Sequence, residues 1–208
     1  MCCKPGYNKV CVMMKLAITG CIGSGKSVVA RAFEIMGVPV YDCDSRAKRL
    51  MVTDPCIVKG LKRMFGEECY AADGELDRAY LASRLFIDNE KVKRVNALVH
   101  PVVKADFLEW AAQQDAAVVA VETALLYESG MIDAVDRALV VWADEETAIR
   151  RTMSRSGMSR NQVLDRMHKQ MSADDLLLLS DYSIFNNGNE PVLPQVVALL
   201  NELHSHKE

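Results

Sequence analysis

The chain has 208 residues, of which 50% are hydrophobic and 25% charged, and its formal net charge is −3 at pH 7. This length and composition are those of a globular protein with one sizeable core and room for a smaller added lobe. The charge provides no overall basic field, so we expect no nucleic-acid partner. No run reaches the roughly 18 apolar residues of a membrane span, so we expect no membrane partner either.

The N-terminal residues 1–13 contain no apolar stretch typical of a secretory leader, and we interpret them as an irregular extension. The seven cysteines form no Cys-x-x-Cys pair. An odd number of cysteines without metal-ligand spacing favours reduced thiols in the cytoplasm. We therefore expect a cytoplasmic protein, and we expect it to be a monomer or a small homo-oligomer.

The first predicted strand is the apolar run at 16–19, which suits a strand buried on both faces. A helix is predicted over 28–36, where apolar residues recur at helical spacing before Gly37. Between them, residues 20–27 read GCIGSGKS. This segment matches the pattern G-x-x-x-x-G-K-[ST] in full, with a strand before it and a helix after it, which is the context that supports the motif.

The loop at 20–27 is predicted to bind a nucleoside triphosphate. Bare glycine backbone lets several N–H groups approach one anion at the helix N-terminus, where the helix dipole adds positive charge. Lys26 supplies a point charge for the outer phosphates, and the Ser27 hydroxyl is a candidate ligand of Mg²⁺. The predicted phosphate contacts are Gly20, Cys21, Ile22, Gly23, Ser24, Gly25, Lys26 and Ser27.

Four further strands are predicted, at 38–44, 116–122, 137–143 and 182–186, and helical patterns separate most of them. This alternation predicts an α/β fold with a doubly wound, five-stranded parallel sheet. The second strand carries Asp42 and Asp44 at its end, and we expect it to lie beside the first, with Asp42 facing an acceptor hydroxyl. Each carboxylate also suits a helix N-cap, and this alternative stays open.

Two segments interrupt the alternation. Residues 45–115 contain amphipathic helical runs and no convincing strand, and we predict that they form a helical lobe that holds the acceptor. Pro101 is expected to break the last run and to start another helix. Residues 150–170 carry six arginines and lysines against one acid, Asp165, which suits a lid over phosphates, although such a run is more often a solvated helix face.

These patterns divide the chain into a nucleotide-binding core, the helical lobe at 45–115 and a lid at 150–180. The core is expected to comprise residues 14–44, 116–149 and 181–208. The predicted reaction is phosphoryl transfer to a small molecule, because such catalysis needs cations around the phosphates, a carboxylate near the acceptor hydroxyl and a lid that excludes water.

Motifs from Met14 to about Leu203 resemble those of the dephospho-CoA kinase family. They include ITGCIGSGKS, GVPVYDCD, DGELDRAYLASRLF, LVHPVV, LLYESG, VDRALVVWADEE, RTMSRSGMSRNQVLDRMHKQ and SDYSIFNNG. The resemblance implies that ATP, with Mg²⁺, phosphorylates the ribose 3′-hydroxyl of dephospho-CoA, the last step of coenzyme A synthesis. It also implies a P-loop α/β core with a helical CoA-binding lobe and a small lid.

The resemblance further implies roles for individual residues. Lys26 and Asp42, with Arg150 and Arg155 of the lid, are implied in catalysis, Asp42 as the base that receives the acceptor proton. The loop from Asn186 to Gly188 is implied to lie near the adenine. The implied acceptor contacts are Asp42, Asp44, Arg46, Arg84, His100, Lys104, Tyr127 and Glu128.

Three alternatives stay open on the sequence alone. They are another small-molecule P-loop kinase of nucleoside or shikimate type, a P-loop ATPase that acts as an assembly factor, and a nucleotide-binding module without catalysis. His100 also suits an ordinary half-buried histidine at a helix junction. Tyr127 and Glu128 equally suit a supporting role for the loop after the third predicted strand. The chain departs from the family at Ala124, where members often have proline.

Overall fold

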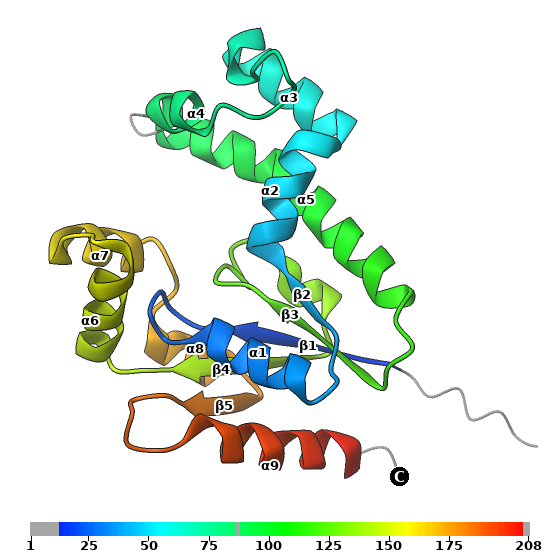
Figure 1. Ribbon diagram of the computed structural model, residues 1–208, viewed down its shortest axis with the longest axis vertical. Helices are drawn as coiled ribbons and strands as arrows, with labels where there is room; N and C mark the ends of the chain where they lie inside the picture. Colours follow the sequence, from blue (N-terminus) through cyan, green and yellow to red (C-terminus); the bar gives the residue numbers. More distant parts are fainter. Residues whose placement is uncertain (1–12, 86–87, 206–208) are drawn as a thin grey trace, which may run out of the picture.

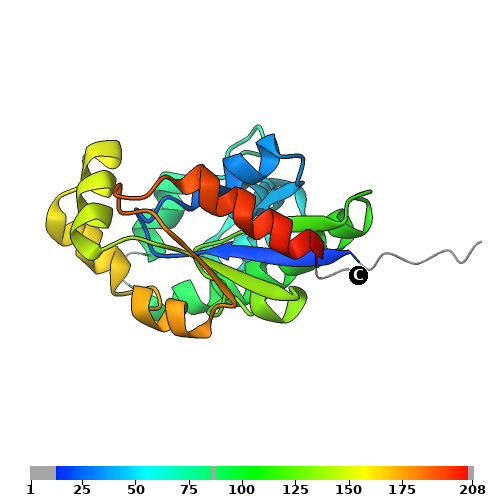
Figure 2. The ribbon, with the colours of Figure 1, turned by 90° about the horizontal axis from the view of Figure 1, so that it is seen from below.

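The computed structural model describes residues 13–85 and 88–205, so the extension expected at 1–13 lies outside the described residues except for its last position. A five-stranded parallel sheet forms the centre, with helices on both faces (Figures 1 and 2). This confirms the predicted α/β class. The strands are β1 (Met14–Thr19), β2 (Val40–Asp42), β3 (Val118–Glu122), β4 (Arg137–Trp142) and β5 (Tyr182–Phe185).

The strands lie in the order β2-β3-β1-β4-β5, so the expectation that the second strand borders the first was wrong. β3 lies between them, and Glu122 pairs with Ile18 on one side and Asp42 on the other. The physical reason is burial: residues 118–121 of β3 are buried, as a central strand requires, whereas β2 has three residues and one exposed end.

The two faces of the sheet bury different helices. α1 (Lys26–Ile35) and α9 (Val192–Ser205) pack on the face that carries Leu16, Ile18 and Val141. α5 (Asn89–Ala112) packs on the opposite face with Val119 and Val121. On that same face α8 (Ala173–Leu179) lies against β4 and buries a single leucine, Leu176. Alternating side chains of the strands therefore supply both halves of the core.

Helices fill the segment between β2 and β3. They are α2 (Cys43–Thr53), α3 (Pro55–Phe65), the short 3₁₀ turn η1 (Glu67–Cys69), α4 (Arg78–Leu85) and α5. The second predicted strand is shorter than expected because α2 begins at Cys43, directly after Asp42. Figure 1 shows these helices rising from one end of the sheet, on the side away from α9.

The helix break expected at Pro101 was wrong, because α5 runs through this residue from Asn89 to Ala112. A proline inside a helix removes one N–H donor and leaves the carbonyl four residues earlier without its partner. Pro101 and Ala97, the residue that carries this carbonyl, are both exposed, so water can replace the missing donor. Buried residues on both sides of the proline, such as Val95 and Phe107, hold the two halves on one apolar surface.

Most of the basic segment lies in two helices joined by a turn. α6 (Glu145–Ser156) ends at Gly157, whose φ is 68°, and α7 (Arg160–Met167) begins after the N-cap Ser159. A short 3₁₀ turn, η2 (Met131–Ala134), precedes β4. Within 13–85 and 88–205, no helix combines the length and the apolar character that crossing a bilayer would take.

Candidate active site

The P-loop at 20–27 joins β1 to α1, and its neighbours determine which positions must be glycine. Gly23 and Gly25 have φ values of 80° and 96°. A Cβ atom on Gly23 would lie 2.2 Å from the carbonyl oxygen of Ala148 in α6, and one on Gly25 would lie 2.1 Å from the side-chain nitrogen of Asn186. The loop is therefore enclosed by α6 on one side and by the segment after β5 on the other.

Lys26 is folded back onto the P-loop. Its Nζ donates hydrogen bonds to the carbonyl oxygens of Gly20 at 2.8 Å and Cys21 at 3.1 Å. Burial lowers the pKa of Lys26, and the nearby charge of Glu122 opposes this effect. Burial likewise raises the pKa of Glu122, which Lys26 opposes. The ammonium group is thus held in place, partly desolvated, beside the predicted phosphate site.

Asp42 is the N-cap of α2, which answers the question of which carboxylate caps this helix. Its Oδ1 accepts hydrogen bonds from the backbone N–H groups of Asp44 at 2.9 Å and Ser45 at 3.2 Å. Its Oδ2 accepts a third from the Ser45 hydroxyl at 2.5 Å. Asp44 lies in the first turn of the same helix. These bonds fix the orientation of the Asp42 carboxylate, which is exposed at the end of β2.

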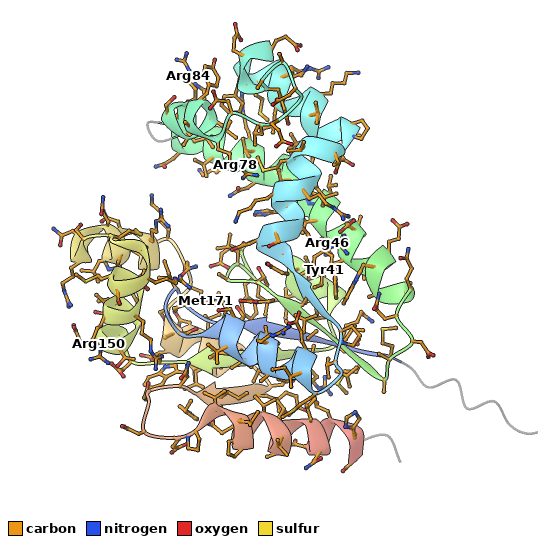
Figure 3. All side chains as sticks on the ribbon, viewed as in Figure 1. Tyr41, Arg46, Arg78, Arg84, Arg150 and Met171 are labelled. Carbon is orange, nitrogen blue, oxygen red and sulfur yellow. The ribbon has the colours of Figure 1, made fainter. Side chains whose placement is uncertain are left out.

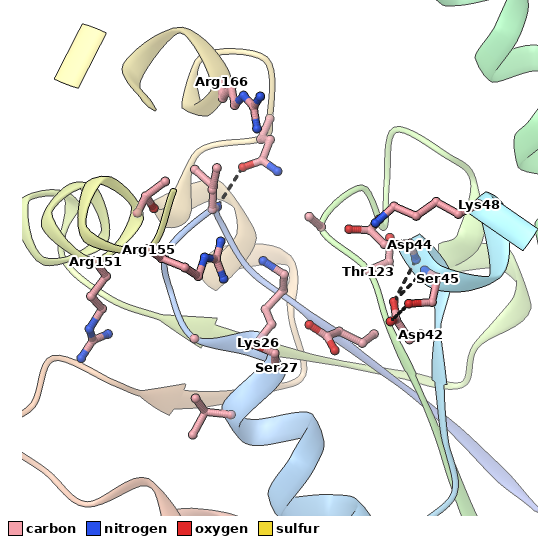
Figure 4. Close-up of a pocket in the computed structure, with 18 residues that line it drawn as sticks. Lys26, Ser27, Asp42, Asp44, Ser45, Lys48, Thr123, Arg151, Arg155 and Arg166 are labelled. Carbon is pink, nitrogen blue, oxygen red and sulfur yellow. Dashed lines mark hydrogen bonds between the residues drawn. The ribbon is translucent and has the colours of Figure 1, made fainter. Parts of the chain in front are cut away.

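A cavity of about 800 Å³ lies between the P-loop, the lid and the start of α2. Lys26 and Ser27 line it from α1, and Asp42, Asp44 and Lys48 line it from β2 and α2. Figure 4 shows Lys26 between the lid arginines and the two aspartates. The structure thus brings a cationic phosphate loop and a fixed carboxylate to the same space.

The segment expected to form a lid contributes arginines to this cavity, but they are not all the ones expected. Arg155 lines the cavity as predicted, together with Arg151 and Arg166. Arg150 is absent from the lining and donates to the Thr147 hydroxyl at 3.3 Å; Figure 3 places it on the outer side of α6. Helical spacing was the available signal, because residues 151 and 155 are four apart and share a face.

Asn186 connects the segment after β5 to the P-loop. Its side-chain N–H donates to the backbone carbonyl oxygen of Ser24 at 2.8 Å, and its backbone carbonyl oxygen accepts from the Arg151 guanidinium at 2.7 Å. Gly188, the other residue expected near the adenine, has a φ of 89° and does not line the cavity. Asn186 thus borders the phosphate loop and the lid helix at once.

Several expected acceptor contacts have other partners. The Arg46 guanidinium lies 5.0 Å from the ring centre of Tyr41 and 3.8 Å from the Asp106 carboxylate. Arg84 lies over the ring of Tyr80 at 5.1 Å, at the far end of the helical segment (Figure 3). Neither arginine lines the cavity.

The remaining expected acceptor contacts lie around α5 and the turn after β3, also outside the cavity lining. Lys104 Nζ donates to the Gly130 carbonyl and to Asp133 Oδ2, both at 2.9 Å. His100 is half-buried on α5, and burial lowers its pKa against the opposing charge of Glu128.

The two expected contacts in the turn after β3 both bind the neighbourhood of α8. Tyr127 donates through its hydroxyl to the Leu179 carbonyl at 3.0 Å. Glu128 accepts from a backbone N–H of the segment before α8.

The sequence reasoning missed several cavity residues, among them Lys48, Thr123 and Gln170 as well as Glu122, Arg151 and Arg166. Lys48 follows Asp44 by one helical turn, so its position on the same face of α2 was available from spacing. Thr123 and Gln170 lie in connecting segments, where no periodic pattern indicates the direction of a side chain.

The donors near Lys26 suit a magnesium ion that arrives with a nucleotide. Within the part of the chain that the structure describes, no three His, Cys, Asp or Glu side chains form a metal-binding group. Ser27 and Glu122 nevertheless place a hydroxyl and a carboxylate in the cavity. Mg²⁺ typically takes one or two protein oxygens and completes its shell with phosphate oxygens and water, so this donor set fits it.

The family model and the curated relatives indicate one family. The family model for dephospho-CoA kinase matches residues 14–191. The dephospho-CoA kinase of Bacteroides fragilis is 38% identical over 192 residues, which cover 92% of this chain and 93% of that protein. The crystal structure of TT1252 from Thermus thermophilus superposes with a TM-score of 0.80 at 36% identity, over 92% of this chain and 98% of its own.

A second solved structure extends the agreement in fold. The dephospho-CoA kinase from Campylobacter jejuni superposes with a TM-score of 0.70 over 93% of this chain and 98% of its own, at 21% identity. The resemblance seen in the sequence motifs is confirmed by the family model and by the Bacteroides relative. This chain belongs to the dephospho-CoA kinase family.

Proposed function

We propose that the cavity binds ATP over the P-loop and dephospho-CoA beside α2, and that the chain transfers the γ-phosphoryl group to the ribose 3′-hydroxyl. The observation that carries this proposal is that Lys26 and Asp42 line one cavity from opposite sides. Membership of the family favours this acceptor over the other small-molecule kinases and the ATPase considered from the sequence.

In the proposed step, the 3′-hydroxyl oxygen forms a bond to the γ-phosphorus while the bond from that phosphorus to the β,γ-bridging oxygen breaks. ADP leaves with the electron pair of the broken bond. The proton of the attacking hydroxyl passes to Asp42, whose carboxylate the N-cap hydrogen bonds hold in one orientation. The products are ADP and coenzyme A.

Cations are proposed to stabilise the transition state of this step, because phosphoryl transfer spreads negative charge over the phosphoryl oxygens. Lys26, Arg155 and Arg166 line the phosphate side of the cavity and are proposed to neutralise this charge. Mg²⁺, held by Ser27 and the ATP phosphates, would supply further positive charge when bound. The backbone N–H groups of the P-loop are proposed to bind the β-phosphate.

Lys48 is proposed as a cationic contact of the acceptor, since it lines the cavity beside Asp42 and Asp44 on α2. The roles implied for Arg46, Arg84, His100, Lys104 and Tyr127 stay proposals that require the helical segment to approach the bound acceptor. Asn186 is proposed to hold the P-loop in shape near the base of the nucleotide. The cysteines described are free thiols, which supports the proposed cytoplasmic location. The proposal of a monomer or small homo-oligomer rests on the sequence alone.

The direct test is to incubate the purified chain with ATP, Mg²⁺ and dephospho-CoA and to follow coenzyme A by mass spectrometry. We expect coenzyme A and ADP in equal amounts. A 3′-deoxy analogue of dephospho-CoA should give no product, because it lacks the attacking oxygen. Release of ADP at the same rate without any acceptor would instead indicate an ATPase, and phosphorylation of shikimate or a nucleoside alone would indicate a different kinase.

A further inference from the structure

The connection between α7 and α8, residues 168–172, is held by three hydrogen bonds, two to the P-loop and one to the turn after β3, and we call this segment the lid base. It carries the second lid helix, α7, on one side. On its other side α8 is fixed to the sheet by the buried side chain of Leu176. If Arg166 of α7 moves relative to the P-loop while α8 stays on the sheet, the backbone of the lid base must change conformation.

Two of these hydrogen bonds join the lid base to the P-loop. The backbone N–H of Ile22 donates to the side-chain oxygen of Gln170 at 2.9 Å. The Cys21 thiol donates to the carbonyl oxygen of Met171 at 3.5 Å. Gln170 also lines the cavity, close in sequence to Arg166. The lid base is thus a direct neighbour of the phosphate loop, as the position of Met171 in Figure 3 shows.

The third hydrogen bond comes from the turn after β3. The backbone N–H of Met171 donates to Oε1 of Glu128 at 2.9 Å. The preceding residue, Tyr127, donates through its hydroxyl to the carbonyl of Leu179 at the other end of α8. Adjacent side chains of one turn therefore fix both ends of α8, and Glu128 fixes the end that leads into the lid.

Glu128 is oriented toward this role rather than toward the cavity. It is not among the residues that line the space between Lys26 and Asp42. Its carboxylate is near enough to His100 on α5 to oppose the lowering of the pKa of that histidine. Glu128 therefore stands between the helical segment and the lid base, and its charged oxygen is a stronger acceptor for the Met171 N–H than a neutral group would be.

We infer that Glu128 is a positioning residue for the lid. By accepting a hydrogen bond from the Met171 N–H, it fixes Gln170 against the P-loop and places Arg166 of α7 over the phosphates. This inference rests on the proposed binding of ATP over the P-loop. It assigns Glu128 an effect on the nucleotide, whereas the sequence left open either contact with the acceptor or support of the loop after the third strand.

The test compares Glu128→Ala and Glu128→Gln in steady-state kinetics with each substrate varied in turn. Glu128→Ala should raise KM for ATP and lower kcat, together about 10-fold in kcat/KM for ATP, with KM for dephospho-CoA changed less than about 2-fold. Glu128→Gln keeps an oxygen acceptor at the same place and should recover most of the loss. Hydrogen exchange should become faster in peptides that contain Ile22 and Met171 in Glu128→Ala alone.

A matched control is Asp136→Ala. Asp136 also accepts a hydrogen bond from a backbone N–H, that of Lys15 at 2.7 Å, but near the start of β1 and away from the P-loop. It should leave both KM values and the exchange of the lid base unchanged. Equal losses in Asp136→Ala would overturn the inference by indicating general destabilisation.

Two other results would also overturn it. A rise in KM for dephospho-CoA with KM for ATP unchanged would make Glu128 an acceptor ligand, and unchanged kinetics with unchanged exchange would leave it without a role. If the wild-type chain made no coenzyme A, the proposed function would fail instead. Hydrogen exchange and ATP affinity by calorimetry, which need no acceptor, would still decide the role of Glu128.

Discussion

The side-chain nitrogen of Asn186 lies 2.8 Å from the carbonyl oxygen of Ser24 and would lie 2.1 Å from a Cβ atom on Gly25. The segment after the last strand therefore touches the phosphate loop near the first, although 162 residues separate the two. Arg151 of the lid donates to the Asn186 carbonyl from the other side. The shape of the P-loop thus depends on the end of the core sheet and on the lid.

Gly25→Ala should abolish measurable ATP binding. The φ of 96° at this position costs an L residue about 1–2 kcal/mol, and the new methyl group would lie 2.1 Å from the Asn186 nitrogen. Either Asn186 or the loop has to move, and both movements disturb the backbone N–H groups that face the phosphates. Isothermal titration calorimetry with ATP and Mg²⁺ measures this loss.

Gly37→Ala is the matched control for that experiment. Gly37 has a similar φ of 85°, and a Cβ atom there would meet nothing within 4 Å. This variant should lose about 1 kcal/mol of stability from backbone strain and keep its ATP affinity. Normal ATP binding by Gly25→Ala, or an equal loss of affinity in Gly37→Ala, would contradict the argument.

Asp42→Asn should reduce kcat by about 10²–10⁴-fold, the usual contribution of a positioned base. Asparagine caps helices about as well as aspartate, so α2 and the thermal stability should be retained, whereas alanine would also remove a cap worth about 1 kcal/mol. ATP affinity should be near that of the wild type. The measurements are the initial rate of coenzyme A formation and the melting temperature of the same preparation.

Asp54→Asn provides the comparison for Asp42. Asp54 caps α3 and accepts from the Ile57 N–H at 2.9 Å, and it does not line the cavity. It should keep full turnover. If Asp42→Asn also kept full turnover, Asp42 would be a structural cap and the proton would require another acceptor.

The parts of the fold that the sequence predicted correctly are those with a strong local cause. The apolar runs gave all five strands, and the P-loop pattern gave the turn before α1, because burial on both faces and positive φ values leave few alternatives there. The neighbours of β2 were not predictable in the same way, since strand order depends on long-range burial. The helix break predicted at Pro101 was wrong for a related reason, because the packing of buried residues on both sides of the proline outweighed its local helix-breaking effect.

The same contrast between local sequence signals and long-range packing applies to the residues of the site. Asp42 and most P-loop residues line the cavity because they lie at or just after the end of a strand, whereas the predicted contacts Gly20, Cys21 and Ser24 are not in the lining. Arg150 was named from the family resemblance, and the structure places Arg151 beside Arg155 in the cavity lining instead. Gln170 has no local pattern at all, and its position beside the P-loop arises from the docking of α8 on the sheet.

Lys48→Met should raise KM for dephospho-CoA by about 10-fold or more, because a charged hydrogen-bond partner in the cavity would be lost. Arg46→Met should change this KM less than about 2-fold and instead lower stability by about 1 kcal/mol, since the Arg46 guanidinium lies over Tyr41 and near Asp106. Steady-state kinetics and chemical denaturation of the two variants separate these effects. The reverse pattern, with Arg46→Met raising KM and Lys48→Met silent, would return the acceptor contact to Arg46.

The half-buried His100 should make the stability of the free protein depend on pH. Burial lowers its pKa from the ordinary 6.5, and the charge of Glu128 opposes this only in part. The unfolded chain therefore binds the proton more readily than the folded one, so the contribution of His100 is present above pH 6.5 and is lost as the pH falls through the lowered pKa.

His100→Gln should remove this dependence. The free energy of unfolding, measured with urea at several pH values from 8 to about 5, should fall less steeply below pH 6.5 in the variant than in the wild type. The comparison uses the change in the difference between the two proteins, so a constant cost of the substitution does not matter. His204→Gln, at an exposed position of α9, should follow the wild-type curve. Parallel curves for His100→Gln and the wild type would show that the folded and unfolded chains protonate His100 alike.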